Sequence, residues 1–122
     1  MRLIPRVLSD AVARVVQGRS GKWPAVRNRW IDSHPACVAC GNKKRSALNV
    51  HHITPHSNDP SKELDDGTNG KPVNLITLCE TGGHLGMNCH LVIGHLGRWY
   101  CYNDHVEADA ALLAKRLVER KT

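Results

Sequence analysis

Four cysteines constrain the fold of this chain more than any other feature. The first two form a Cys37-x2-Cys40 pair, and the best second pair is Cys79 with Cys89. Tetrahedral structural zinc usually takes its four ligands from two such pairs. Nine residues separate Cys79 from Cys89, instead of the usual two, so His84 stands as the alternative fourth ligand. The pattern predicts one structural Zn²⁺ per chain.

The composition explains why a structural metal is needed. The chain has 122 residues, only 4% aromatic residues, no Phe, 10 Gly and 6 Pro, so it should form one domain with a small core. Pro5, Arg6 and Asp10 interrupt the N-terminal apolar run, so no export signal or membrane span is expected. Cysteine pairs in such a chain predict metal binding rather than disulfides, and we expect a cytoplasmic protein.

Positive charge is concentrated near the N-terminus. Residues 1–30 hold the whole formal net charge of +6, while acids and bases balance in residues 31–122. This asymmetry predicts an arm that meets a polyanion such as double-stranded DNA. A solvated basic helix pair that only aids solubility is the alternative.

The periodicity predicts a mixed sequence of short elements. Residues 1–34 are expected to form a basic helical arm, and residues 35–122 a compact domain with a C-terminal helix. The expected helices are Ser9–Gln17, Ala25–Ser33, a short one at Asn88–Ile93, and Val106–Arg120. The expected strands are Leu48–Ile53 and Leu75–Leu78, separated by a long loop over residues 54–73.

Two adjacent histidines, His51 and His52, lie near the end of the first expected strand. Successive strand residues point to opposite faces, so His51 and His52 should have separate roles. His90 and His95 lie five residues apart, about 140° around an ideal helix, so they could share one metal only if the helix ends or kinks at Gly94.

Several segments together resemble the HNH endonuclease family, in particular its phage and prophage members. The segments that match the family are Val50-His51-His52-Ile53-x-Pro55, Asn74-Leu75-Ile76-Thr77-Leu78-Cys79 and Cys89-His90. Those that resemble the phage and prophage members are Lys22-Trp23-Pro24, Cys37-x2-Cys40-Gly41, Glu63-Leu64-Asp65, Gly94-His95-Leu96-Gly97-x-Trp99 and Tyr102-Asn103. The resemblance runs from about Arg19 to Ala110. It implies an α+β, zinc-stapled domain with a ββα-metal (His-Me finger) core flanked by N- and C-terminal helices.

The resemblance also implies roles for individual residues. His52 would be the general base that activates water, and Asn74 would hold the loop and the base in place. His51 and His90 would bind a catalytic divalent ion (Mg²⁺, Mn²⁺ or Ni²⁺), with His95 as a third ligand or a phosphate contact. Glu63 and Asp65 are expected to brace the loop through hydrogen bonds, with a carboxylate near the metal as the alternative.

DNA contacts are expected from two basic groups, because phosphate contacts supply most non-specific affinity. The candidates are Arg19, Lys22, Arg27 and Arg29 near the N-terminus, and Lys43, Lys44 and Arg45 beside the first cysteine pair. Trp23, Trp30 and Trp99 are expected in the core because so few other aromatics exist to fill it. Cys101 is expected to be a small apolar residue near Trp99.

The resemblance therefore predicts a metal-dependent DNA endonuclease, a monomeric nicking enzyme in the host cytoplasm that acts alongside a phage terminase. Two alternatives remain open at this point. One is a non-catalytic zinc-knuckle DNA-binding module, which would not need the histidines and Asn74. The other is a restriction enzyme for modified DNA, which usually carries an added recognition domain.

Overall fold

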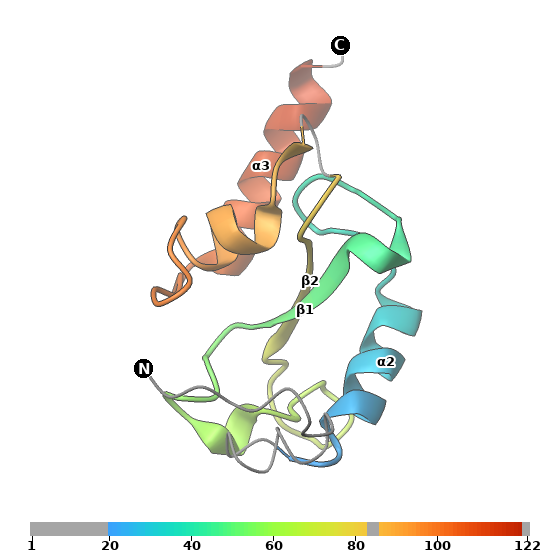
Figure 1. Ribbon diagram of the computed structural model, residues 1–122, viewed down its shortest axis with the longest axis vertical. Coiled ribbons are helices and arrows are strands. Elements are labelled where there is room, and N and C mark those ends of the chain that lie inside the picture. Colours follow the sequence, from blue (N-terminus) through green and yellow to red (C-terminus); the bar gives the residue numbers. More distant parts are fainter. Residues whose placement is uncertain (1–19, 83–85, 121–122) are drawn as a thin grey trace, which may run out of the picture.

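The computed structural model describes residues 20–82 and 86–120, and Figure 1 gives the order of the elements. The expected helix at residues 9–17 lies outside the described residues. Helices α2 (Trp23–Ser33) and α3 (Val106–Arg120) flank strands β1 (Leu48–His52) and β2 (Leu75–Cys79) and a single π-helical turn, η4 (His90–Gly94). The described residues also include two short 3-10 turns, η1 (Arg45–Ala47) and η2 (Pro60–Lys62).

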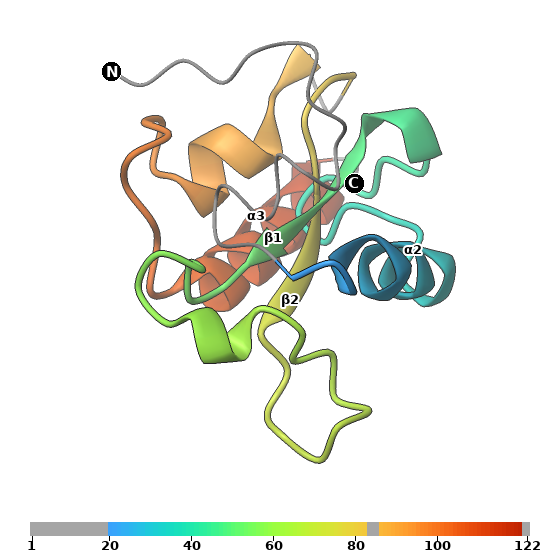
Figure 2. The same cartoon turned by 60° about the horizontal axis from the view of Figure 1, so that its bottom comes forward.

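The two strands pair antiparallel, with Leu48 opposite Cys79 and His52 opposite Leu75. Figures 1 and 2 show α2 on one side of the strands, and η4 with α3 on the other. Because side chains alternate along a strand, His51 points toward η4 and His52 points toward α2. The predicted α+β class is confirmed, with a ββα arrangement in which the third element is η4.

Two apolar clusters hold these layers together. The first surrounds Leu78, Ile93 and Val106 and includes the buried cysteines. The second lies under α2, where Val26 and Trp30 share one helical face and pack on Val50. The α2 segment, although part of the predicted arm, therefore packs directly on the sheet.

Buried polar groups of the second cluster find partners inside it. Trp30 Nε1 donates to Thr77 Oγ1 over 3.0 Å, and the Thr77 hydroxyl donates to the carbonyl oxygen of His34. These bonds satisfy the polar groups that the packing of α2 removes from water.

The structure corrects several expectations. Trp99 is not a core residue, because 54% of it is exposed. The short helix expected at Asn88–Ile93 is the π-helical turn at His90–Gly94. Helix α2 begins at Trp23 rather than Ala25, and the strand bounds differ by one residue.

Among residues 20–82 and 86–120, no helix combines the length and the apolar character that a membrane crossing requires.

Candidate functional site

Four cysteines from distant parts of the chain meet at one point. The sulfur atoms of Cys37, Cys40, Cys79 and Cys89 all lie within 4.8 Å of one another, and those of Cys40 and Cys79 are 3.6 Å apart. Cys79 ends β2, and Cys89 comes directly before η4. Gly41 turns the chain between the first two cysteines and the rest of the loop, with φ +80°. The cluster can hold zinc, while His84 lies outside the described residues.

Without a cation, these thiols do not ionise alike. A hydrogen bond from the Cys89 thiol lowers the pKa of Cys37 to about 4. Burial raises the pKa of Cys79 to about 11, and the hydrogen bond to Cys37 raises the pKa of Cys89. The pKa of Cys37 therefore lies far below those of Cys79 and Cys89. A bound divalent cation is what would stabilise four thiolates together.

Three histidines form a second cluster on the η4 side of the sheet. His51 comes from β1, His90 begins η4, and His95 directly follows it. One ring nitrogen from each lies within 4.8 Å of the others, and the ring centroids are 4.8 to 5.1 Å apart.

The π-helical turn explains how residues five apart can meet. In an α-helix His90 and His95 would diverge, whereas a π turn closes between residues five apart and returns them to the same side. Their Nε2 atoms are 3.2 Å apart. The widened turn also brings the backbone of Gly94 against the ring of His51.

Hydrogen bonds fix the tautomers of these rings. His90 Nδ1 donates to Glu80 Oε1 over 3.0 Å, and His95 Nδ1 donates to the carbonyl oxygen of Cys101 over 2.7 Å. Burial would raise the pKa of Glu80, but hydrogen bonds from Asn49 and His90 outweigh it and lower that pKa, so the carboxylate is an acceptor only. Both Nε2 atoms therefore carry lone pairs that face each other.

Two opposed lone pairs at this distance repel unless a proton or a metal ion lies between them. His51 adds a third such atom, because its Nε2 is buried and has no hydrogen-bond partner among the described residues. Burial, together with the nearby charges of His90 and His95, lowers the pKa of His51 to about 3, so the ring is neutral. Neutral imidazoles with fixed tautomers are the form that binds divalent metals, so these residues fit such an ion.

His52 has a different environment on the opposite face of β1. Its Nε2 donates to the carbonyl oxygen of Glu63 over 2.9 Å, and its ring centroid lies 4.5 Å from that of Trp23. The hydrogen bond places the proton on Nε2 and the lone pair on Nδ1. This is the tautomer that an imidazole base needs.

Asn74 ties the loop after β1 to the start of β2. Its side-chain oxygen accepts from the Thr54 amide over 2.7 Å, and its amide group donates to the carbonyl oxygens of Thr54 and Lys62 over 3.1 Å. Lys62 directly precedes Glu63, whose carbonyl holds His52. Asn74 therefore holds the backbone that orients the His52 ring.

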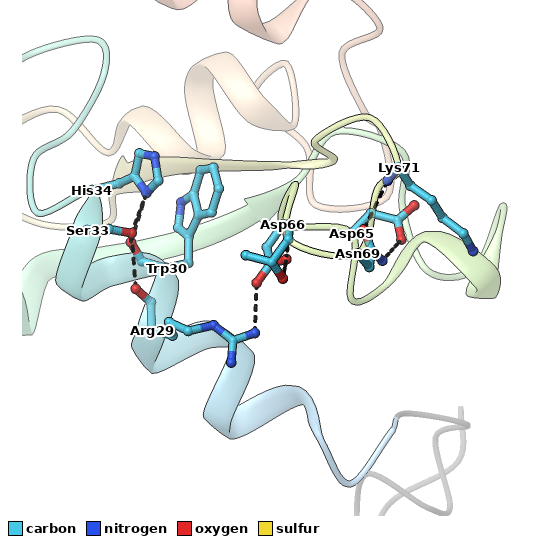
Figure 3. A network of polar contacts seen from close by, with 9 residues as sticks. Arg29, Trp30, Ser33, His34, Asp65, Asp66, Asn69 and Lys71 are labelled. Carbon is cyan, nitrogen blue, oxygen red and sulfur yellow. Dashed lines mark hydrogen bonds and ion pairs between the residues drawn. The ribbon is translucent and has the colours of Figure 1, made fainter.

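Glu63 and Asp65 brace the same loop. Glu63 Oε1 accepts from the Ser20 amide, and Asp65 Oδ1 accepts from the side chain of Asn69. Figure 3 shows the Asp65–Asn69 contact beside Lys71.

The residues expected to contact DNA have diverse surroundings. Arg29 extends from α2 to Asp66 over 2.9 Å, as Figure 3 shows, and Arg45 pairs with Asp32 over 2.7 Å. Arg27 donates to the carbonyl oxygen of Leu48. Lys22, Lys43 and Lys44 are exposed, and Arg19 lies outside the described residues. Two of the expected phosphate contacts are thus already paired with carboxylates.

Sequence reasoning missed Glu80, and it named Gly94 only as the place where the helix could end or kink. Glu80 follows Cys79 at the end of a strand, and nothing in its neighbours marks it as a partner of His90. Gly94 has no side chain and therefore leaves space for the ring of His51 on β1. Both roles depend on contacts between segments far apart in the chain.

Comparison with known protein families finds one match: a model described as HNH endonuclease covers residues 37–81. The match includes His51, His52 and Asn74, whereas Cys89, His90 and His95 lie beyond it. No curated protein matches the chain. No solved structure matches it either.

Proposed function

We propose that this protein is a metal-dependent DNA endonuclease that hydrolyses phosphodiester bonds with a histidine-activated water, because residues 37–81 match a family model described as HNH endonuclease. The observation that carries the proposal is the convergence of His51, His90 and His95 with their lone pairs directed at one another. A binding module would have no use for three converging imidazoles, one of which is buried with an unpaired Nε2.

The three histidines would hold Mg²⁺, Mn²⁺ or Ni²⁺, and the four cysteines a structural Zn²⁺. When bound, the catalytic cation would neutralise charge on the phosphate and assist the leaving 3′ oxygen. Glu80 and the Cys101 carbonyl orient two of the ligand rings, and Gly94 gives the third ring its space.

His52 would accept the proton of the attacking water at Nδ1. The carbonyl of Glu63 holds the opposite nitrogen, and the ring of Trp23 packs against the imidazole, so the base is oriented before substrate arrives. Asn74 is a positioning residue, since it contacts only the backbone that orients His52.

Among the described residues, the proposed phosphate contacts are Lys22, Arg27, Lys43 and Lys44. Arg29 and Arg45 would join them once DNA displaces their carboxylate partners, Asp66 and Asp32. A monomer with one such site would cut one strand at a time, so we expect nicking. The resemblance of the flanking motifs to phage proteins supports a role beside a terminase in DNA packaging.

Plasmid relaxation tests the proposal. Wild-type protein should convert supercoiled plasmid to open circles with at least one of Mg²⁺, Mn²⁺ and Ni²⁺. His52→Ala should lose on the order of 10²–10⁴-fold in rate, the usual contribution of a general base. His105→Ala, at an exposed histidine outside the cluster, is the matched control and should cut like wild type. DNA binding without cleavage under any of these ions would favour the zinc-knuckle binding module.

A further inference from the structure

The exposed aromatic side chains of this protein gather in one short segment beside the histidine cluster. Trp23 and Trp30 are buried under α2, whereas Trp99 is 54% exposed and Tyr100 80% exposed. Tyr102 and the aliphatic Leu96 are exposed in the same segment. A contiguous exposed apolar surface usually marks an interaction site.

Backbone hydrogen bonds hold this segment in a defined turn. The Arg98 amide donates to His95, the Cys101 amide donates to Arg98, and the Asn103 amide donates to Gly94, over 2.9 to 3.1 Å. Leu96 has a φ of 55°, a left-handed conformation that is rare for a residue other than glycine. Such strain is concentrated at ligand-binding sites, and a turn whose backbone is already ordered loses little backbone entropy on binding.

The aromatic ring of Trp99 lies beside the rings of two proposed metal ligands, His90 and His95. The Trp99 ring centroid lies 5.2 Å from that of His90 and 5.0 Å from that of His95. The same segment supplies the Cys101 carbonyl that orients His95. A nucleotide whose phosphate is bound at the histidines therefore has its base or its neighbour's base within reach of these rings.

We infer that residues 96–102 form a DNA-contacting surface, here called the aromatic turn, whose rings stack on an unpaired or displaced base next to the scissile phosphate. The inference rests on the proposed function and adds to it a preference for locally distorted DNA. Stacking suits any base, since every base has an aromatic face. Arg98, which donates to the Tyr100 hydroxyl over 2.9 Å, adds a cation for a flanking phosphate.

A perfect duplex keeps its bases stacked within the helix, so the aromatic turn would engage only after a base is displaced at an energetic cost. A bulge supplies an unpaired base without that cost. The structure therefore predicts tighter binding to bulged DNA than to a perfect duplex of the same flanking sequence.

The test measures binding of full-length protein to two fluorescent duplexes, one perfect and one with a two-nucleotide bulge, at one salt concentration. All variants carry His52→Ala so that DNA stays intact. Tyr100→Ala should weaken binding to bulged DNA by on the order of 10-fold and leave the perfect duplex nearly unchanged. Tyr100 is preferred to Trp99 because the Trp99 ring touches two proposed metal ligands.

Leu112→Ala is the matched control, because it also removes an exposed apolar side chain, but from α3. It should keep the preference for bulged DNA. Equal binding of both duplexes by the Tyr100-intact protein, or a preference that survives Tyr100→Ala, would overturn the inference and leave the rings to a protein partner.

Plasmid relaxation with His52 intact separates this inference from the proposed function. Tyr100-dependent binding to bulged DNA without cleavage would support the aromatic turn and reject the endonuclease. Cleavage together with Tyr100-independent binding would support the endonuclease and reject the aromatic turn. Failure to bind either duplex would reject the aromatic turn.

Discussion

The α-carbon of Gly94 faces the imidazole of His51 so closely that a β-carbon at position 94 would lie 3.0 Å from Cε1 of that ring. The same β-carbon would lie 3.1 Å from Nδ1 and 3.2 Å from Nε2. His51 is only 3% exposed, so its ring has little room to retreat. The ring of His51 can therefore occupy its place in the cluster only because residue 94 is a glycine.

Gly94→Ala should weaken binding of Mn²⁺ by about 10-fold or more, because the added methyl displaces a ligand ring. Titration calorimetry on zinc-loaded protein measures this. Gly21→Ala is the matched control, since a β-carbon at position 21 meets nothing within 4 Å. Unchanged affinity in Gly94→Ala would show that His51 is not a ligand or that its ring shifts without penalty.

Glu80→Gln should weaken Mn²⁺ binding by about 10- to 100-fold. The glutamine amide can donate to His90 Nδ1, which would place the ring proton on Nε2, the atom proposed to bind the cation. Nitrogen NMR of the cation-free protein reports the His90 tautomer directly. Glu107→Gln, at an exposed acid on α3, should change neither quantity. A His90 tautomer that is the same with and without the Glu80 carboxylate would rule out this role.

Asn74→Asp should slow cleavage at least about tenfold while the zinc site stays intact. The carboxylate can still accept from the Thr54 amide, but it cannot donate to the carbonyls of Thr54 and Lys62. Leaving such groups unpaired costs about 1–3 kcal/mol each, so thermal stability should fall as well. Faster hydrogen exchange at the Thr54 amide would locate the effect. Asn58→Asp, at an exposed asparagine of the same loop, is the control.

Zinc content should separate the clustered cysteines from Cys101. Cys37→Ser should lose the single zinc expected per chain and unfold, because the small core depends on that metal. Cys101→Ser should keep the zinc, since Cys101 lies outside the sulfur cluster and contributes its carbonyl group to His95. Elemental analysis with circular dichroism measures both. A folded, zinc-free Cys37→Ser protein would contradict the prediction.

Stability without the catalytic cation should fall as the pH is lowered from about 6.5 to about 3. The folded-state pKa of His51 is lowered from 6.5 to about 3, mainly by burial. Within that window the unfolded chain binds a proton that the folded protein does not, so acid favours unfolding; above it this histidine contributes no pH dependence. Urea unfolding across this range should show a steeper pH dependence for wild type than for His51→Asn. An equal pH dependence of the unfolding free energy in both proteins would show that folding does not lower the pKa of His51.

Local patterns predicted much of the framework. Helices at α2 and α3, two short strands and the long loop between them follow from periodicity and from turn residues, because these signals act between near neighbours. Trp99 shows where such reasoning failed. A scarcity of aromatics favoured a core position, yet its neighbours in space are two partly buried imidazoles and the ring itself is exposed.

The sequence alone determined which residue types could carry the chemistry: adjacent histidines with opposite directions, four cysteines, and an asparagine before the second strand. The tertiary structure decided how they meet. The π-helical turn, which ends at Gly94, returns His90 and His95 to one side, and the folded arrangement brings Glu80 to His90 and Gly94 to His51. These contacts join separate segments through backbone geometry and the space that a missing side chain leaves. Residue identity and spacing do not encode such contacts in any local pattern.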